Sequence, residues 1–173
     1  MAKQATGTDR YANKAYGKVT MSAANTLTFS EIPTNVNIMD KVAWVLHRLE
    51  WFIPAGSFAE MGAIGEGLNV ALTMSNSISS LALNSAAIID SLQFFAVAVL
   101  AGTSAKHQQF PVIRDFSMMP GGGLIIAPRP LFIAMTSNGA GGACVCECRL
   151  YYSNITMSSE DYLDLIDFYR IIA

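Results

Sequence analysis

The sequence predicts an all-β protein: an eight-stranded antiparallel jelly-roll sandwich with a flexible N-terminal arm and a short C-terminal α-helix. Short runs rich in β-branched and aromatic residues recur from Val19 to Tyr152, separated by glycine, proline and small polar residues. No repeat of about 20–50 residues is present, which argues against a propeller or a solenoid. A helical pattern of apolar residues then ends the chain. We therefore expect an arm at 1–17, a sandwich at 18–157 and a helix at 158–173.

The segment 118–137 gives the clearest strand signal. Its two apolar runs, 124–127 and 131–135, are separated by Pro-Arg-Pro at 128–130. Each run is too short for a stable helix, and proline prevents a helix from continuing across the junction. The three glycines at 121–123 supply turn conformations that other residues resist. We interpret the two runs as the penultimate pair of strands in the sandwich.

The N-terminal half of the predicted sandwich contains three further strand signals. Residues 18–32 alternate apolar with Thr and Ser and are interrupted near 23–25, while 68–75 alternates without interruption. Segment 40–53 fits two patterns, a helical stripe of apolar residues or a strand with Arg48 and Glu50 pointing outward. Its enrichment in Val, Trp, Phe and Ile favours the strand. The glycine-rich stretch that follows, up to residue 67, is expected to be a loop.

In the C-terminal half, we expect a helical turn at 86–92 and strands at 93–100, 111–118 and 143–153. The last of these contains C-V-C-E-C. Because alternate residues of a strand share a face, the cysteines would lie on one face of the strand, and Glu147, Arg149 and Tyr151 on the other. A metal site is one interpretation, but zinc-binding cysteines usually come as C-x2-C pairs on loops. We favour core packing for the three thiols, Cys144, Cys146 and Cys148.

The composition predicts that the protein associates with other chains. Hydrophobic residues make up 52% of the chain and charged residues only 14%, against about a quarter in ordinary soluble domains. So few charges leave apolar surface uncovered, and a partner is the usual cover for such surface. The most apolar stretch, 86–102, contains Asp90 and Gln93 and is shorter than the roughly 20 residues of a membrane span. We expect no transmembrane segment and no secretory signal. The absence of a disulfide framework points to intracellular synthesis.

Signals for an enzyme are scarce. The two histidines, His47 and His107, lie far apart in sequence, and neither belongs to a known catalytic or metal-binding motif. The glycines at 121–123 are not followed by the Lys-Ser or Lys-Thr of a phosphate-binding loop, so a tight turn is the better interpretation. Acidic residues at 161, 164 and 167 are expected to form a solvated edge of the terminal helix. We therefore expect no enzymatic activity, no cofactor and no metal.

Charge is distributed unevenly between the two ends of the chain. The arm is polar and lacks periodicity, and the first eighteen residues hold four cations against Asp9. The segment 158–173 holds four acidic residues against Arg170. Four cations provide weak, salt-sensitive binding to phosphates. They are the candidate contacts to nucleic acid: Lys3, Arg10, Lys14 and Lys18.

The terminal helix is expected to begin at Ser158, a favourable N-cap, with acidic residues in its first turn. Tyr162, Leu165, Ile166 and Tyr169 form the apolar stripe of an amphipathic helix. Further apolar residues lie off this stripe, so one helix face would cover the sandwich and another a neighbouring subunit. The candidate subunit contacts are Tyr162, Leu163, Ile166, Phe168 and Ile171.

Five features of the chain carry a resemblance to a known family: the short basic arm, the eight strands, F-S-M-M-P-G-G-G-L-I-I-A-P-R-P-L-F-I-A-M at 116–135, C-R-L-Y-Y-S-N-I-T-M at 148–157, and S-S-E-D-Y-L-D-L-I at 158–166. In their order and spacing, the chain resembles the single jelly-roll capsid proteins of small non-enveloped icosahedral viruses. The arm is less basic than arms that package a genome alone, and the chain is too short for a projecting domain.

This resemblance implies a structural protein of the virion, synthesised in the host cytoplasm, that self-assembles into an icosahedral shell. Its expected partners are many copies of itself, with genomic nucleic acid at the arm and a second capsid or spike protein as further candidates. The alternative that we weigh is a trimeric jelly-roll adhesin, or the head domain of a spike or fibre.

Overall fold

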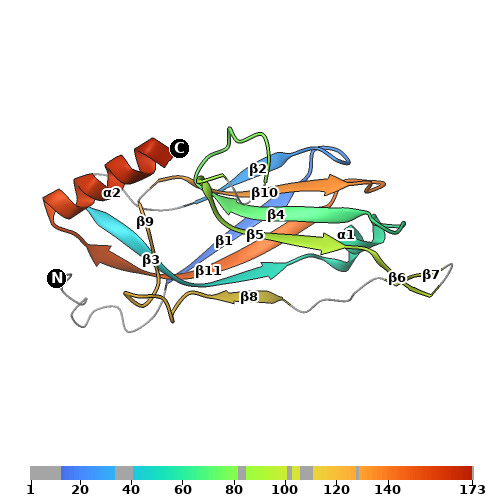
Figure 1. Ribbon diagram of the computed structural model, residues 1–173, viewed down its shortest axis with the longest axis horizontal. Helices are drawn as coiled ribbons and strands as arrows, with labels where there is room; N and C mark the ends of the chain where they lie inside the picture. The colour runs from blue at the N-terminus through green and yellow to red at the C-terminus, as the bar shows by residue number, and fades with distance from the viewer. Residues whose placement is uncertain are drawn as a thin grey trace.

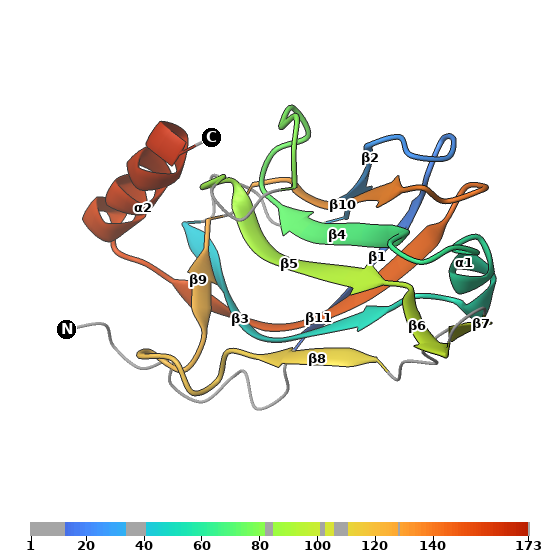
Figure 2. The same ribbon diagram turned by 45° about the vertical axis from the view of Figure 1, so that its right-hand side comes forward.

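Two antiparallel β-sheets lie face to face in the computed structural model (Figures 1 and 2). The structure describes residues 13–33, 41–81, 85–100, 103–105, 111–127 and 129–172. The first sheet has the order β1 (Asn13–Thr20), β11 (Val145–Thr156), β3 (Val42–Phe52) and β8 (Val112–Asp115), and β9 (Leu124–Ile126) also pairs with β3. The second sheet has the order β2 (Thr28–Ile32), β10 (Leu131–Asn138), β4 (Gly67–Thr73) and β5 (Ile88–Phe95). A separate hairpin, β6 (Val97–Leu100) with β7 (Thr103–Ala105), and two helices, α1 (Ala55–Ala59) and α2 (Ser159–Ile172), complete the described elements.

The strands pair in a nested order. The first strand pairs with the last, β1 with β11, and the second with the last but one, β2 with β10. Next come β3 with β8 and β9, and finally β4 with β5. Successive pairs alternate between the two sheets. A long antiparallel hairpin rolled across two sheets produces this order, which is that of a jelly roll. The predicted all-β sandwich is confirmed.

Several predicted boundaries differ from the structure. β1 begins at Asn13, so 13–17 belong to the sandwich and not to the arm, whose other residues lie outside the described part of the chain. The expected helical turn at 86–92 is wrong, because β5 already begins at Ile88. The expected loop at 54–67 contains the short helix α1. β9 and β10 are both strands as predicted, but they lie in opposite sheets.

Most of the ambiguous segment 40–53 is a strand, β3 (Val42–Phe52), and an irregularity explains its mixed pattern; residue 40 lies outside the described residues. Tyr151 of β11 pairs with Arg48, while the next residue, Tyr152, pairs with Leu46. His47 is therefore an extra residue, a β-bulge, and the alternation of faces changes phase there. As a result Leu46 and Leu49 both point into the core three positions apart. That spacing is typical of a helix face, which is why both patterns fitted.

The core lies between the sheets and is built from alternate residues of each strand. Val19, Leu49, Trp51, Leu72 and Ile133 are among its fully buried side chains. Cys146, Cys148 and Leu150 of β11 and Cys144, the residue before it, form a buried row, which confirms the predicted packing of the thiols. The core residues thus come from both sheets and from strands far apart in sequence.

A carboxylate connects the two sheets at one side of the sandwich. Asp90 of β5 accepts a hydrogen bond of 2.9 Å from Nε1 of Trp51 on β3. The other oxygen of Asp90 lies 3.4 Å from Nε of Arg114 on β8. β5 and β8 are the last strands in the order of their sheets. Asp90 therefore holds together the two sheets where no backbone ladder joins them.

Helix α2 follows β11 and covers the part of β3 and β11 that extends beyond the second sheet (Figures 1 and 2). Ser158 begins it as predicted, because its Oγ accepts a 3.1 Å hydrogen bond from the backbone N–H of Asp161. The same hydroxyl lies 2.7 Å from Oδ2 of Asp161, to which it donates. Tyr162 is buried, and Leu165 packs against the core of the sandwich. One face of α2 is thus part of the folded domain.

We predict that Gly123→Ala destabilises the fold. A Cβ at Gly123 would lie 2.5 Å from Cγ1 of Val45 and 2.8 Å from the carbonyl oxygen of Leu46, so β3 would have to move. Overpacking of this kind costs about 1–3 kcal/mol, which chemical denaturation of the purified protein would measure. Gly56→Ala in α1 is the matched control, because nothing lies within 4 Å of its added Cβ. Equal stability of the two variants would contradict the prediction.

Candidate functional site

The outer face of the first sheet carries a cluster of charged and aromatic side chains. They occupy the alternate positions of three strands that point away from the second sheet, because the residues between them are buried in the core. We call this cluster the outer strip: Lys14, Tyr16 and Lys18 of β1, Glu147, Arg149 and Tyr151 of β11, and Arg48 and Glu50 of β3.

The register of the strands arranges the outer strip in three rows that cross the sheet. Directly opposed residues on one face of a sheet are close enough to interact. From β1 to β3, the rows are Lys14–Tyr151–Arg48, Tyr16–Arg149–Glu50 and Lys18–Glu147, the last of which is extended by Phe52 of β3 next to the strip. Each row therefore combines a cation with an aromatic ring.

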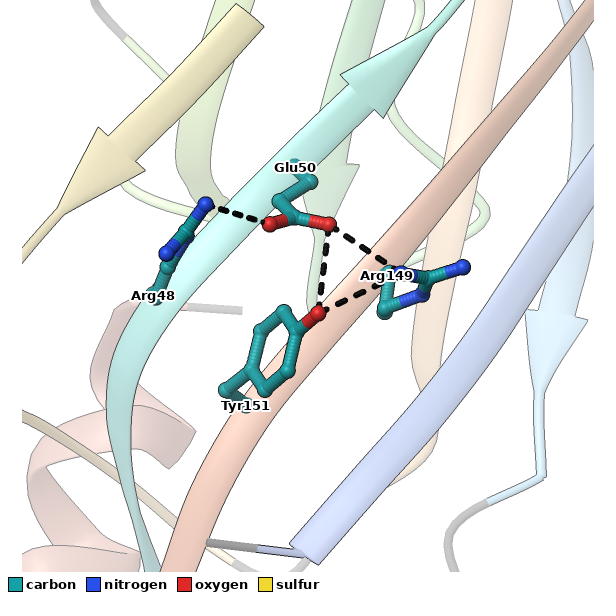
Figure 3. Close-up of polar contacts among 4 residues, drawn as sticks. All are labelled: Arg48, Glu50, Arg149 and Tyr151. Atoms are coloured by element: carbon teal, nitrogen blue, oxygen red, sulfur yellow. Dashed lines mark hydrogen bonds and ion pairs between the residues drawn. The ribbon is translucent and has the colours of Figure 1, made fainter. Parts of the chain in front are cut away.

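Glu50 is the centre of the polar contacts (Figure 3). One of its carboxylate oxygens lies 2.6 Å from Nη2 of Arg48, and the other lies 3.5 Å from Nη1 of Arg149. The hydroxyl of Tyr151 donates to this second oxygen at 3.3 Å and accepts from Nη1 of Arg149, also at 3.3 Å. Only 16% of the Glu50 side chain is exposed. A carboxylate shielded in this way fixes the positions of two guanidinium groups on the surface of the sheet.

Cations also lie over the two tyrosine rings of the outer strip. The guanidinium of Arg149 is 5.1 Å from the ring centroid of Tyr16. Lys14 Nζ and the guanidinium of Arg48 lie 5.5 Å and 5.6 Å from the centroid of Tyr151. These distances are within the range of cation–π attraction. The ring of Tyr151 is thus engaged by two cations, whereas Tyr16 has one and remains 59% exposed.

One charged group of the outer strip and one beside it have shifted pKa values. The hydrogen bond to Tyr151, followed by the charges of Tyr16 and Tyr151, raises the pKa of Arg149 above its usual value. Beside the outer strip, at the end of β8, hydrogen bonds from the Ser117 hydroxyl and backbone lower the pKa of Asp115. Both groups therefore stay ionised throughout the physiological range.

The two sheets differ strongly in charge. The outer strip contains four cations and two carboxylates. The four strands of the second sheet contain two charged residues, Glu31 and Asp90, and Asp90 bonds to a core tryptophan. On the outer face of that sheet, Ala71 and Ala134 are covered by apolar residues that include Ile78 and Leu81. The sandwich therefore presents one charged, aromatic face and one largely neutral face.

His47 links three segments at the bulge of β3. Its Nδ1 lies 2.8 Å from the carbonyl oxygen of Gly122, and its Nε2 lies 2.8 Å from Oγ of Ser153. The carbonyl can only accept, so Nδ1 carries a proton and donates to it. The side chain is half-buried, and its contacts hold the 116–123 loop against β3 and β11.

The three cysteines are enclosed in the core. Burial raises the pKa of all three thiols, that of Cys146 well above its usual value and that of Cys148 to about 12. A thiol in this state is a poor nucleophile. Within the described ranges, no three His, Cys, Asp or Glu residues are grouped so that they could hold a metal ion.

The residues predicted as nucleic-acid contacts fall into two groups. Lys14 and Lys18 lie on the outer face of β1, and Lys18 forms a 3.4 Å ion pair with Glu147. Lys3 and Arg10 lie outside the described part of the chain.

The predicted subunit contacts all lie on α2. Tyr162 is 5% exposed, Ile166 is half-buried and Leu163 is 60% exposed, so Leu163 presents the most surface to a neighbour. Phe168 and Ile171 are in the helix, but their side chains lie outside the described part.

The sequence predicted that Arg48 and Glu50 point outward if 40–53 is a strand, but it did not identify them, or Tyr16, as members of one site. Alternation along the last strand did place Glu147, Arg149 and Tyr151 on one face. The missing information was the pairing register, which brings β1 and β3 to either side of β11. The signal available in the sequence was the alternation of cations and tyrosines at every second position of β1 and β11, which indicates a shared outer face.

No protein-family model matches this chain, and no curated protein matches it in sequence. In the part of the chain that was searched, neither helix has the length and apolar character needed to cross a membrane.

We predict that the three cysteines of the native protein react slowly with a thiol reagent such as DTNB, and that denaturant releases three reactive equivalents. Burial raises the pKa of Cys148 from 9.0 to about 12, so the folded state holds this proton more tightly than the unfolded state. The stability from this group is fully present below pH 9.0 and is lost as the pH rises toward 12. Rapid labelling of any thiol in the native protein at about pH 8 would contradict this arrangement.

Proposed function

We propose that this protein is a structural subunit that assembles with copies of itself into an icosahedral viral shell. The observation that carries the proposal is the distribution of exposed apolar side chains over a charge-poor jelly roll. Apart from Tyr16 of the outer strip, large exposed apolar side chains occur on the first sheet, on the 116–125 segment, near α1, on β5 and on α2: Phe52, Ile64, Phe95, Ile113, Met118, Met119, Ile125 and Leu163.

This distribution favours several neighbours over one. A dimer buries a single self-complementary patch, whereas a shell subunit makes different contacts around several symmetry axes. Each contact in a shell can be weak, because every subunit makes several of them at once. Apolar side chains spread over separate elements fit the second arrangement.

The segment that follows β8 is well suited to such a contact. Met118 is 91% exposed, yet the turn that carries it is firmly held. Backbone hydrogen bonds join Met119 N to Phe116 O and Gly122 N to Met119 O, and His47 binds Gly122. Because the backbone of this turn is already ordered, only the side chain at its apolar tip loses conformational freedom when a neighbour buries it.

The proposal also assigns a role to α2. Tyr162 and Leu165 attach the helix to its own domain, while Leu163 faces away. In the proposed shell, the side of α2 that carries Leu163 packs against an adjacent subunit.

The purified chain should form closed particles of many subunits, observed by negative-stain microscopy and multi-angle light scattering. A monomer that persists at high concentration, across salt and pH, would refute the proposed function. Compact trimers would instead favour the adhesin or spike-head interpretation.

We predict that Leu163→Asp prevents or strongly reduces particle formation, because a charge would have to be buried in an apolar contact. The fold should persist, since this side chain is 60% exposed. Asp164→Asn, at the neighbouring exposed position, is the control and should assemble normally. Circular dichroism would verify the fold of both variants. Normal particles from Leu163→Asp would exclude this side of α2 from the subunit contacts.

A further inference from the structure

We propose that the outer strip is a contact site for single-stranded nucleic acid, with a base stacked on Tyr16. This inference rests on the proposed function, since it names what the shell would enclose and which face of the sandwich would meet it. It adds to the arm a second contact, built on the sheet itself.

The ring of Tyr16 is the central element of the site. Proteins that bind single strands combine cations that follow the backbone with aromatic rings on which bases stack. Tyr16 lies in the middle of the exposed face of β1, and 59% of its surface is accessible. The guanidinium of Arg149 lies over one face of this ring, 5.1 Å from its centroid, so the proposed base stacks on the opposite face and the cation backs the ring.

Lysines flank this ring on the same strand. Lys14 and Lys18 are two residues before and after Tyr16, which places them about 7 Å away along the strand on the same face. A single strand of nucleic acid that runs along β1 across Tyr16 would therefore find a lysine on either side of the stacked base. Each lysine could bind a phosphate.

The acidic residues of the outer strip do not block such binding. Lys18 and Glu147 form an exposed pair, with side chains 63% and 42% exposed, and pairs of this kind contribute little free energy. Lys18 can exchange Glu147 for a phosphate at small cost. Glu50 is shielded, and its ion pairs keep the guanidinium groups of Arg48 and Arg149 on the face of the sheet.

A comparison of the two sheets, and a comparison of two classes of ligand, favour nucleic acid as the occupant of the outer strip. The strands of the second sheet contain no lysine or arginine, although Phe95 of β5 exposes a ring to a similar extent, 57%. An acidic protein segment would use the cations of the outer strip but not the exposed ring. A ligand with both phosphates and flat bases uses both.

The experiment measures binding of a fluorescein-labelled oligo(dT) 20-mer to the full chain by fluorescence anisotropy at low salt. Tyr16→Ala should weaken binding by about tenfold, and Tyr16→Phe should retain it within about twofold, because either ring can stack. Phe95→Ala is the matched control and should bind like the wild type. Lys3 and Arg10 are kept in every variant, so any contribution of the arm is common to all.

Two further ligands separate stacking from charge. A 20-mer with abasic sites throughout should bind the wild type and Tyr16→Ala equally, and polyglutamate should compete poorly. The slope of log K against log salt should not exceed about 4, since the four cations of the outer strip and Lys3 and Arg10 of the arm contribute at most about 0.7 each. Equal binding of oligo(dT) by the wild type and Tyr16→Ala, or effective competition by polyglutamate, would overturn the proposal.

The outcomes for this site and for assembly can be told apart by light scattering on the same samples. Particles that form while oligo(dT) does not bind would overturn the outer strip as a nucleic-acid site and leave the proposed shell intact. Tyr16-dependent binding by a chain that never assembles would support the site and refute the shell.

Discussion

The pairing of the first strand with the last is the constraint on which the rest of this structure depends. β1 and β11 pair along their whole common length, from Asn13 with Tyr152 to Thr20 with Val145. On the inner side, Gly17 allows a close approach, because a Cβ there would lie 2.9 Å from both Cys148 Sγ and Ile32 Cγ1. Small residues of β1 and β11 thus let a residue of the second sheet pack directly against this pair. On the outer side, the same register creates the rows of the outer strip.

Local patterns were sufficient to predict much of the fold. Alternation in the cysteine strand identified the buried face, and Ser158 with the acidic residues after it identified the start of α2. Those features depend on residues a few positions apart. Features that depend on distant partners were not predicted: the start of β1 at Asn13, the bulge at His47 and the assignment of β9 and β10 to different sheets. A polar, small segment such as 13–17 has no strand signal of its own and becomes a strand because β11 lies beside it.

The same distinction applies to the candidate sites. The two lysines that the structure places on β1 were selected for their charge, which is visible in the sequence. The role of Glu50 depends on three partners at different distances along the chain, Arg48, Arg149 and Tyr151, and only the folded register brings them together. Conversely, Tyr162 has the same apolar character as its neighbours on α2, and only its packing shows that it belongs to the interior.

The bulge at His47 also affects how the first sheet ends. β3 pairs with β8 through 48–51 and with β9 through 44–46, so the two short strands form one edge that the 116–123 loop interrupts. A long continuous edge offers free backbone groups to any passing strand and invites growth into fibres. Here the interruption leaves two segments of four and three residues. This edge of the first sheet is thereby poorly suited to open-ended polymerisation through its backbone.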